Sequence, residues 1–133
     1  MVVVDTNILV YLLIEGDRTK QAQALLGRDA EWRSEAFVLV EFSNVLATYV
    51  RAASLTPEQA QSLMAQAEQR VRGLVNLPHA SALRVAQEFG VSAYDARFLA
   101  TARNLGARLV TEDAKLRAAA PALTHSLQEA IAA

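Results

Sequence analysis

The fold is decided by the first seven residues, Met1-Val2-Val3-Val4-Asp5-Thr6-Asn7. Three valines in a row are stiff at χ1 and suit a strand that is buried on both faces. The apolar run 8–14 that follows is too long to be a turn and is predicted to be a helix. Asp5 is therefore expected where a buried strand passes into a helix. In open α/β sheets this carboxyl edge of the strands is where ligands bind.

The composition is that of an ordinary globular protein. Of the 133 residues, 53% are hydrophobic and 20% are charged, which excludes an intrinsically disordered chain. The length predicts one domain that spans residues 1–133 and buries a sizeable core. The chain has no cysteine, which excludes disulfides, thiolate metal sites and a cysteine nucleophile. This fits a reducing, cytoplasmic location.

No part of the sequence predicts contact with a membrane. No stretch approaches the ~18–20 apolar residues that a membrane-spanning helix needs. The apolar start lacks a basic region and is interrupted by Asp5, so a secretory signal is not expected. The formal net charge of −1 argues by itself against a nucleic-acid partner, but the charges are unevenly distributed.

Short strands are predicted to alternate with longer helices. Apolar periodicity and capping residues predict helices over 8–14, 19–26, 36–51, 57–73, 79–89, 92–106, 112–120 and from about 127. Strands are expected over 2–4, 31–34, 74–77, 108–111 and 123–125. Each of the five isolated glycines is expected to cap the C-terminus of a helix. The alternation is typical of a parallel sheet that helices cover on both faces.

Four acids are candidates for a common site, although each has a simpler structural explanation. Asp5 and Asp113 both suit the N-cap of the helix that follows. Asp95 could complete a capping box with Ser92, and Glu41 could pair with an arginine. Together, however, the acids fall just after strands or early in helices. In a parallel sheet these positions meet at one edge, so we expect the four carboxylates to converge.

Converging carboxylates point to a bound divalent cation. They repel one another and raise one another's pKa values, and a cation relieves this repulsion. Mg²⁺ and Mn²⁺ prefer carboxylate oxygen and water. Two such ions about 3.5–4 Å apart can hydrolyse a phosphodiester, one activating water and the other stabilising the leaving oxygen. The sequence shows neither a glycine-rich phosphate loop nor a Ser/His/Asp constellation that would indicate other chemistry.

Four segments resemble the motifs of the PIN-domain nucleases, most closely those of the VapC-type toxins of bacterial toxin–antitoxin pairs. They are residues 4–9, 40–46, 92–102 and 109–113, in the order of the family. The resemblance implies a three-layer α/β/α sandwich with a mostly parallel central sheet. It also implies that one or two Mg²⁺ or Mn²⁺ ions are held by the catalytic acids Asp5, Glu41, Asp95 and Asp113.

The same resemblance implies the activity and the partners. The protein is expected to be a metal-dependent endoribonuclease that cuts cellular RNA, with Thr6, Asn7 and Thr111 orienting the carboxylates or the water. Members of the family usually form homodimers, and a small antitoxin protein holds them inactive by covering the active-site groove. A cognate antitoxin and a second copy of the chain are therefore the expected protein partners.

The distribution of charge agrees with an RNA substrate. The net charge of −1 becomes +3 when the four candidate acids are set aside, and five of the thirteen basic residues lie within 97–117. Arg97 and Lys115 are candidates for phosphate contacts, although a solvated helix face would also explain them. Aromatic residues make up 6% of the chain, so base stacking is expected to be limited, with RNA shape and single-stranded loops setting the preference.

Three other functions stay open from the sequence. The chain could be a non-catalytic RNA-binding or dimerisation module that retains the acids for folding. It could be a nuclease of the same fold that acts on DNA. A receiver-type phosphoacceptor domain is also an α/β protein with acids at the sheet edge, but the predicted strand 74–77 lacks the aspartate that such a domain would phosphorylate.

Overall fold

The computed structural model describes every residue from 1 to 133 and contains one four-stranded sheet. The strands are β1 (Val2–Val4), β2 (Trp32–Arg33), β3 (Leu109–Val110) and β4 (Thr124–His125). Every neighbouring pair is parallel, and the strand order is β2-β1-β3-β4. The predicted α/β class with a parallel sheet is therefore confirmed, and β1 lies in the interior of the sheet.

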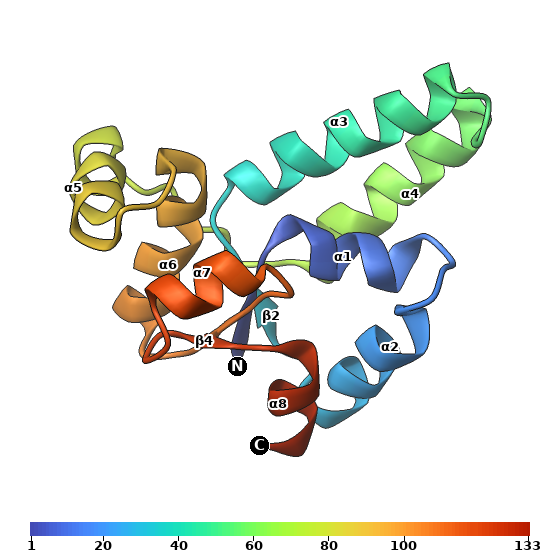
Figure 1. The fold of residues 1–133 in the computed structure, drawn as a ribbon. Helices are drawn as coiled ribbons and strands as arrows, with labels where there is room; N and C mark the ends of the chain where they lie inside the picture. The colour runs from blue at the N-terminus through green and yellow to red at the C-terminus, as the bar shows by residue number, and fades with distance from the viewer.

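Eight helices surround the sheet (Figure 1). They are α1 (Thr6–Leu13), α2 (Thr19–Arg28), α3 (Phe37–Arg51), α4 (Pro57–Arg70), α5 (His79–Phe89), α6 (Ala93–Leu105), α7 (Ala114–Ala119) and α8 (Leu127–Ala132). Each lies within a few residues of a helix predicted from the sequence. None is long and apolar enough to cross a membrane.

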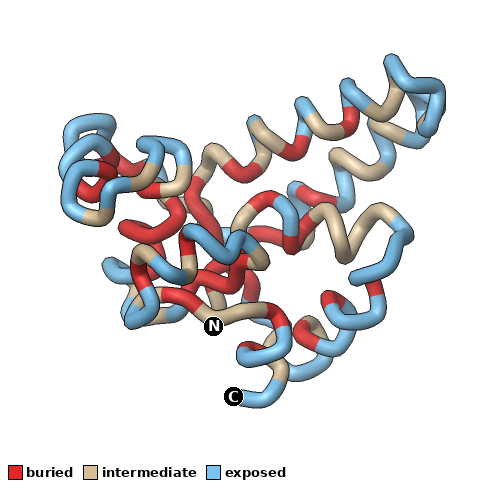
Figure 2. The backbone as a smooth tube through the Cα atoms, viewed as in Figure 1, coloured by how far each residue is buried: buried red, intermediate tan, exposed pale blue.

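The sheet separates two apolar clusters, because successive strand residues point to opposite faces. On one face, Val3 and Leu109 pack with buried residues of α3, α5 and α6. On the other face, Val4, Val110 and Trp32 pack with buried residues of α2 and α8. In Figure 2 the buried segments run through the centre of the molecule, and the outer helix surfaces are exposed. This is the predicted three-layer α/β/α sandwich.

Helices α3 and α4 pack against each other as a hairpin that projects from the rest of the molecule (Figure 1). The buried residues of α3 are Val38, Phe42 and Leu46, which repeat at the four-residue spacing of one helical face. Glu41 lies beside this face, in the first turns of the helix. The N-terminal end of α3 thus positions the candidate acid Glu41 near the sheet.

The strand expected over 74–77 is reduced to one bridge. Val75 pairs in parallel with Glu35, through hydrogen bonds from Ala36 N to Val75 O (2.8 Å) and from Val75 N to Ser34 O (3.0 Å). Pairing stops there because the partner segment passes into α3, and Ala36 already has helical backbone angles. The segment therefore extends the edge of the sheet beyond β2 without forming a full strand.

The glycine prediction is correct at two of five positions. Gly90 and Gly106 end α5 and α6 in the left-handed conformation, with φ of 67° and 66°. Gly27 instead lies within α2, which Asp29 ends by extended backbone. The remaining two glycines follow the C-caps of α1 and α4 by two residues. An extended residue can end a helix without glycine, so glycine position alone placed these boundaries wrongly.

Helix α4 begins with the capping box that the sequence predicts. The Thr56 hydroxyl accepts from Gln59 N at 3.1 Å, and the Gln59 side chain accepts from Thr56 N at 2.9 Å. Thr56→Ala is expected to lower the free energy of unfolding by about 1 kcal/mol, because it leaves a helix N–H without its partner. Chemical denaturation measures this change. Thr56→Ser keeps the hydroxyl and should restore stability; equal stability of the alanine variant would contradict the capping role.

Candidate active site

The four predicted acids line one pocket of about 740 Å³ at the carboxyl edge of the sheet. Asp5 directly follows β1, and Asp113 lies shortly after β3. Glu41 and Asp95 reach the same pocket from α3 and α6. No lysine, arginine or histidine is among the lining residues. The chain thus gathers four carboxylates in one place without supplying a basic side chain to compensate them.

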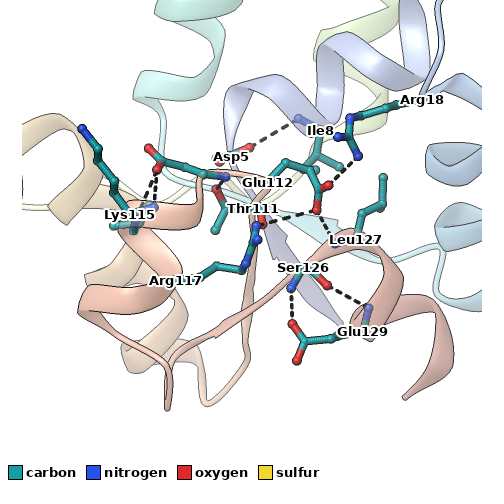
Figure 3. Close-up of polar contacts among 12 residues, drawn as sticks. Asp5, Ile8, Arg18, Thr111, Glu112, Lys115, Arg117, Ser126, Leu127 and Glu129 are labelled. Carbon is teal, nitrogen blue, oxygen red and sulfur yellow. Dashed lines mark hydrogen bonds and ion pairs between the residues drawn. The ribbon is translucent and has the colours of Figure 1, made fainter.

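Asp5 joins the end of β1 to the start of α1. Its Oδ1 accepts a hydrogen bond from Ile8 N at 3.3 Å, so Asp5 is the N-cap of the helix (Figure 3). Burial raises the pKa of this carboxyl from 3.8 to about 6, while hydrogen bonds from Thr111 and from Ile8 N act in the opposite direction. The negative charges of Asp95 and Glu41 raise the pKa further. Asp5 therefore both caps α1 and belongs to the group of acids in the pocket.

Hydroxyl groups, rather than cations, contact the acids. Thr6 Oγ1 donates to Glu41 Oε1 at 2.5 Å and so ties α1 to α3 across the pocket. The buried Thr111 accepts from Asp113 N at 3.1 Å and also hydrogen-bonds to Asp5. These two predicted supporting residues therefore touch three of the four acids. Asn7, the third, is an exposed residue in the pocket lining.

Asp95 and Asp113 also combine a structural role with a place in the pocket. Asp113 is the N-cap of α7, where its Oδ1 accepts from the backbone N–H groups of Lys115 and Leu116 at 2.9 and 3.2 Å. Asp95 donates its own backbone N–H to the Ser92 hydroxyl at 3.0 Å. Burial raises the pKa of the Asp95 carboxyl, and the negative charge of Asp113 adds to this effect.

Glu112 is adjacent to Asp113 but belongs to a different set of contacts (Figure 3). Its carboxylate pairs with Arg18 at 2.5 Å and accepts from Leu127 N, at the start of α8, at 2.8 Å. Arg117 lies 3.9 Å from the same carboxylate. Glu112 is therefore neutralised on the α8 side, and only Asp113 of this acidic pair lines the pocket.

The two predicted phosphate contacts lie outside the pocket lining. Arg97 Nη1 pairs with the buried Glu35 at 3.3 Å and donates to Leu77 O at 3.0 Å, and its Nη2 lies 2.6 Å from His79 Nδ1. The guanidinium is thus directed into the protein. Lys115 is exposed on α7, beside Asp113.

Glu35 is a residue that the sequence reasoning missed. It is 2% exposed and links α3 to α6, because its Oε1 accepts from Phe37 N at 3.1 Å while its Oε2 pairs with Arg97. A signal was available: like Asp5, Glu35 is an acid that comes shortly after a predicted strand. Its pairing with Arg97, 62 residues away, was not visible in the sequence.

The donor set suits a hard divalent cation, although the carboxylates are not preorganised around one. Four carboxylates and the Asn7 amide are the oxygen ligands that Mg²⁺ and Mn²⁺ prefer. No group of three Asp, Glu, His or Cys side chains, however, has a geometry that could hold a metal ion. Glu41 and Asp113 each have an oxygen engaged by a protein donor. A cation would therefore require side-chain rotation or bridging waters, which Mg²⁺ readily keeps.

Comparison with known proteins identifies the family. The PIN domain model matches residues 2–121, and the chain belongs to the PIN-domain family. Ribonuclease VapC3 of Pyrobaculum aerophilum is 26% identical over 125 residues, which cover 91% of this chain and 95% of that protein.

Solved structures show the same fold. PAE2754 from Pyrobaculum aerophilum superposes with a TM-score of 0.79 at 21% identity, over 98% of this chain and 91% of that one. A toxin–antitoxin complex from Klebsiella pneumoniae gives 0.69 at 22% identity, over 94% and 97%. VapBC2 from Rickettsia felis, bound to a DNA fragment from their promoter, gives 0.65 at 21% identity, over 93% and 96%.

The raised pKa of Asp5 predicts a pH dependence of stability in the absence of divalent ions. Between pH 3.8 and about 6 the folded protein holds a proton that the unfolded chain releases. The free energy of unfolding is therefore expected to fall as the pH rises through this range, and this contribution levels off above it. Asp5→Asn keeps an N-cap acceptor but carries no charge, so it should be more stable than the wild type at neutral pH by about 2–3 kcal/mol.

Denaturation in EDTA at acidic and neutral pH measures both effects. The exposed Asp17 provides the control, since Asp17→Asn should leave the stability and its pH dependence unchanged. Equal stabilities of Asp5→Asn and the wild type at neutral pH would show that the ionised Asp5 carboxylate does not lower the free energy of unfolding.

Arg97→Met is expected to lower the free energy of unfolding by about 3–5 kcal/mol, because it leaves the buried Glu35 carboxylate without its counterion. Arg103 is the matched control on the same helix: it pairs with Glu88 at an exposed position, so Arg103→Met should cost less than about 1 kcal/mol. Thermal or urea denaturation measures both. Adding Glu35→Gln to Arg97→Met should recover part of the loss; no recovery would contradict the ion pair as the cause.

Proposed function

We propose that this PIN-domain protein is a metal-dependent endoribonuclease and the toxin of a toxin–antitoxin pair. The observation that carries the proposal is the pocket of four carboxylates with no basic side chain among its lining residues. Membership of the PIN family and the similarity to ribonuclease VapC3 support RNA hydrolysis over the other chemistries that acids at a sheet edge could serve.

Asp5, Glu41, Asp95 and Asp113 would hold one or two Mg²⁺ or Mn²⁺ ions. Bound ions would supply an activated water and stabilise the charge on the leaving oxygen. The other residues position these acids. Thr6 fixes the Glu41 carboxylate, and Thr111 holds both the Asp5 side chain and the Asp113 backbone.

The substrate phosphate has one candidate contact outside the acids. We propose Lys115 for this role, since it is exposed and lies in the first turn of the helix that Asp113 caps. We do not extend the proposal to Arg97, because its guanidinium pairs with Glu35 and lies against Leu77 O inside the protein. A positive charge committed to a buried carboxylate offers little attraction to a phosphate.

The proposed protein partners are a cognate antitoxin and a second copy of the chain in a cytoplasmic homodimer. The neighbours from Klebsiella pneumoniae and Rickettsia felis are a toxin–antitoxin complex and a VapBC protein, which supports an antitoxin partner for this fold. Residues 1–133 are proposed to act as one domain, with the sheet and both apolar clusters within this range.

Cleavage of total cellular RNA by the purified protein tests the function. Discrete fragments are expected with Mg²⁺ or Mn²⁺ and none with EDTA. Asp5→Asn and Asp95→Asn should each reduce the rate by more than the roughly 10–100-fold that loss of a metal ligand's hydrogen-bonding partner costs. Asp17→Asn, an exposed acid outside the pocket, serves as the control and should cleave like the wild type.

Three outcomes would contradict the proposal in whole or in part. Metal-independent cleavage that persists in Asp5→Asn would show that the activity does not come from these acids. RNA binding without turnover under any divalent ion would instead favour a non-catalytic binding module, which the lack of a ready-made metal geometry would also fit. Cleavage of DNA in preference to RNA would leave the proposed phosphodiester hydrolysis standing but would contradict RNA as the substrate.

A further inference from the structure

Two stacked aromatic rings lie in the wall of the acid pocket. Phe37, the first residue of α3, and Tyr94, near the start of α6, have ring centroids 5.2 Å apart and planes within 6° of parallel. Both line the pocket that contains the four acids. Tyr94 is nevertheless 62% exposed. Phe37 thus covers one side of the Tyr94 ring, and a large part of Tyr94 remains open to solvent.

The position of this aromatic pair is fixed by the buried Glu35. Glu35 accepts from the backbone N–H of Phe37 and pairs with Arg97, which lies one helical turn beyond Tyr94 on α6. The starts of α3 and α6 are therefore joined beneath the two rings. A ring held in this way loses little conformational freedom when a second flat group stacks on it, which favours binding.

A purely structural role does not account for the arrangement. An aromatic residue that joins two helices stabilises the fold most when it is buried, because the stabilisation comes from the apolar area removed from water. Tyr94 is among the most exposed large side chains of the protein, and its neighbour in the pocket wall, Val40, is 59% exposed. Both residues line the pocket in which the acids would bind a phosphate.

We propose that Tyr94, supported by Phe37, is a stacking platform for one base of single-stranded RNA next to the scissile phosphate. The inference rests on the proposed nuclease function and adds a base-binding subsite to it. Every base has a π-face, so an aromatic platform holds a nucleotide without reading its identity. Asp95 is the next residue after Tyr94, which places the base subsite directly beside the acids.

The aromatic content had suggested that base stacking would be limited. Three of the eight aromatic residues, however, line this single pocket: Phe37, Tyr94 and Phe98. A low total content does not exclude a local platform, because tertiary structure brings together rings from separate helices. A protein side chain could also cover these rings, and the test below separates that occupant from a base.

Fluorescence binding to a short single-stranded oligoriboadenylate with a central 2-aminopurine tests the proposal. All variants carry Asp5→Asn so that the RNA stays intact. In this background, quenching of 2-aminopurine is expected on binding. Adding Tyr94→Ala should weaken binding by about tenfold or more and abolish the quenching, because one base loses its stacking partner.

Three further variants separate stacking from other roles. Tyr94→Phe keeps the ring and should retain both affinity and quenching, which excludes the hydroxyl as the cause. Tyr94→Leu keeps apolar contact with Phe37 but should behave like Tyr94→Ala, while its melting temperature shows that the fold is intact. Leu83 is 54% exposed on α5 and lies outside the pocket lining, so Leu83→Ala should change nothing.

The results distinguish failure of the subsite from failure of the function. If the wild type cleaves RNA and Tyr94→Ala binds and quenches like its parent, the stacking proposal is overturned and the nuclease stands. If the wild type neither binds nor cleaves RNA, both proposals fail. If Tyr94→Ala keeps RNA binding but loses association with an inhibitory protein partner, the rings belong to a protein interface and the stacking proposal is again overturned.

Discussion

Parallel pairing of β1 on both of its sides is the constraint on which the site depends. Val3 lies opposite Arg33 of β2 and Leu109 of β3, so the central strand cannot shift without breaking two ladders and moving residues between the two apolar clusters. Asp5 is the first residue beyond this strand. Its position is therefore set by backbone geometry deep in the protein, and the helices bring the other acids to it.

Two acids next to the pocket have basic partners, whereas no basic side chain lines the pocket itself. Glu35 has Arg97, and Glu112 has Arg18 and Arg117 close to its carboxylate. The carboxylates of Asp5, Glu41 and Asp113 instead accept from hydroxyl or backbone N–H groups, which orient a carboxylate but leave its charge in place. The protein thus pairs its own cations with the neighbouring acids and leaves the pocket acids without a basic side chain among the lining residues. Burial is the main cause of the raised pKa values of Asp5 and Asp95, and the negative charges of neighbouring acids add to it.

The sequence predicted best what depends on local pattern. It predicted β1, the helices and the meeting of the four acids, because strand-to-helix transitions in a parallel sheet share one edge. It did not predict the partner of Arg97, since a contact across 62 residues leaves no mark in a single sequence. It also overestimated the strand near Val75, where apolar content suggested a longer strand than the single bridge to Glu35, beyond which the partner segment becomes helical. The stack of Phe37 on Tyr94 arises from tertiary packing alone.

The register of the sheet has a consequence for synthesis of the protein. Val3 of β1 is synthesised more than a hundred residues before its partner Leu109, and Asp113 comes after that. Non-local pairing of this kind forms late, because the chain between the two strands must first be present. A growing chain on the ribosome therefore carries Asp5 and Glu41 long before the pocket exists. The proposed ribonuclease would in this way lack a complete set of acids until Asp113 has been synthesised.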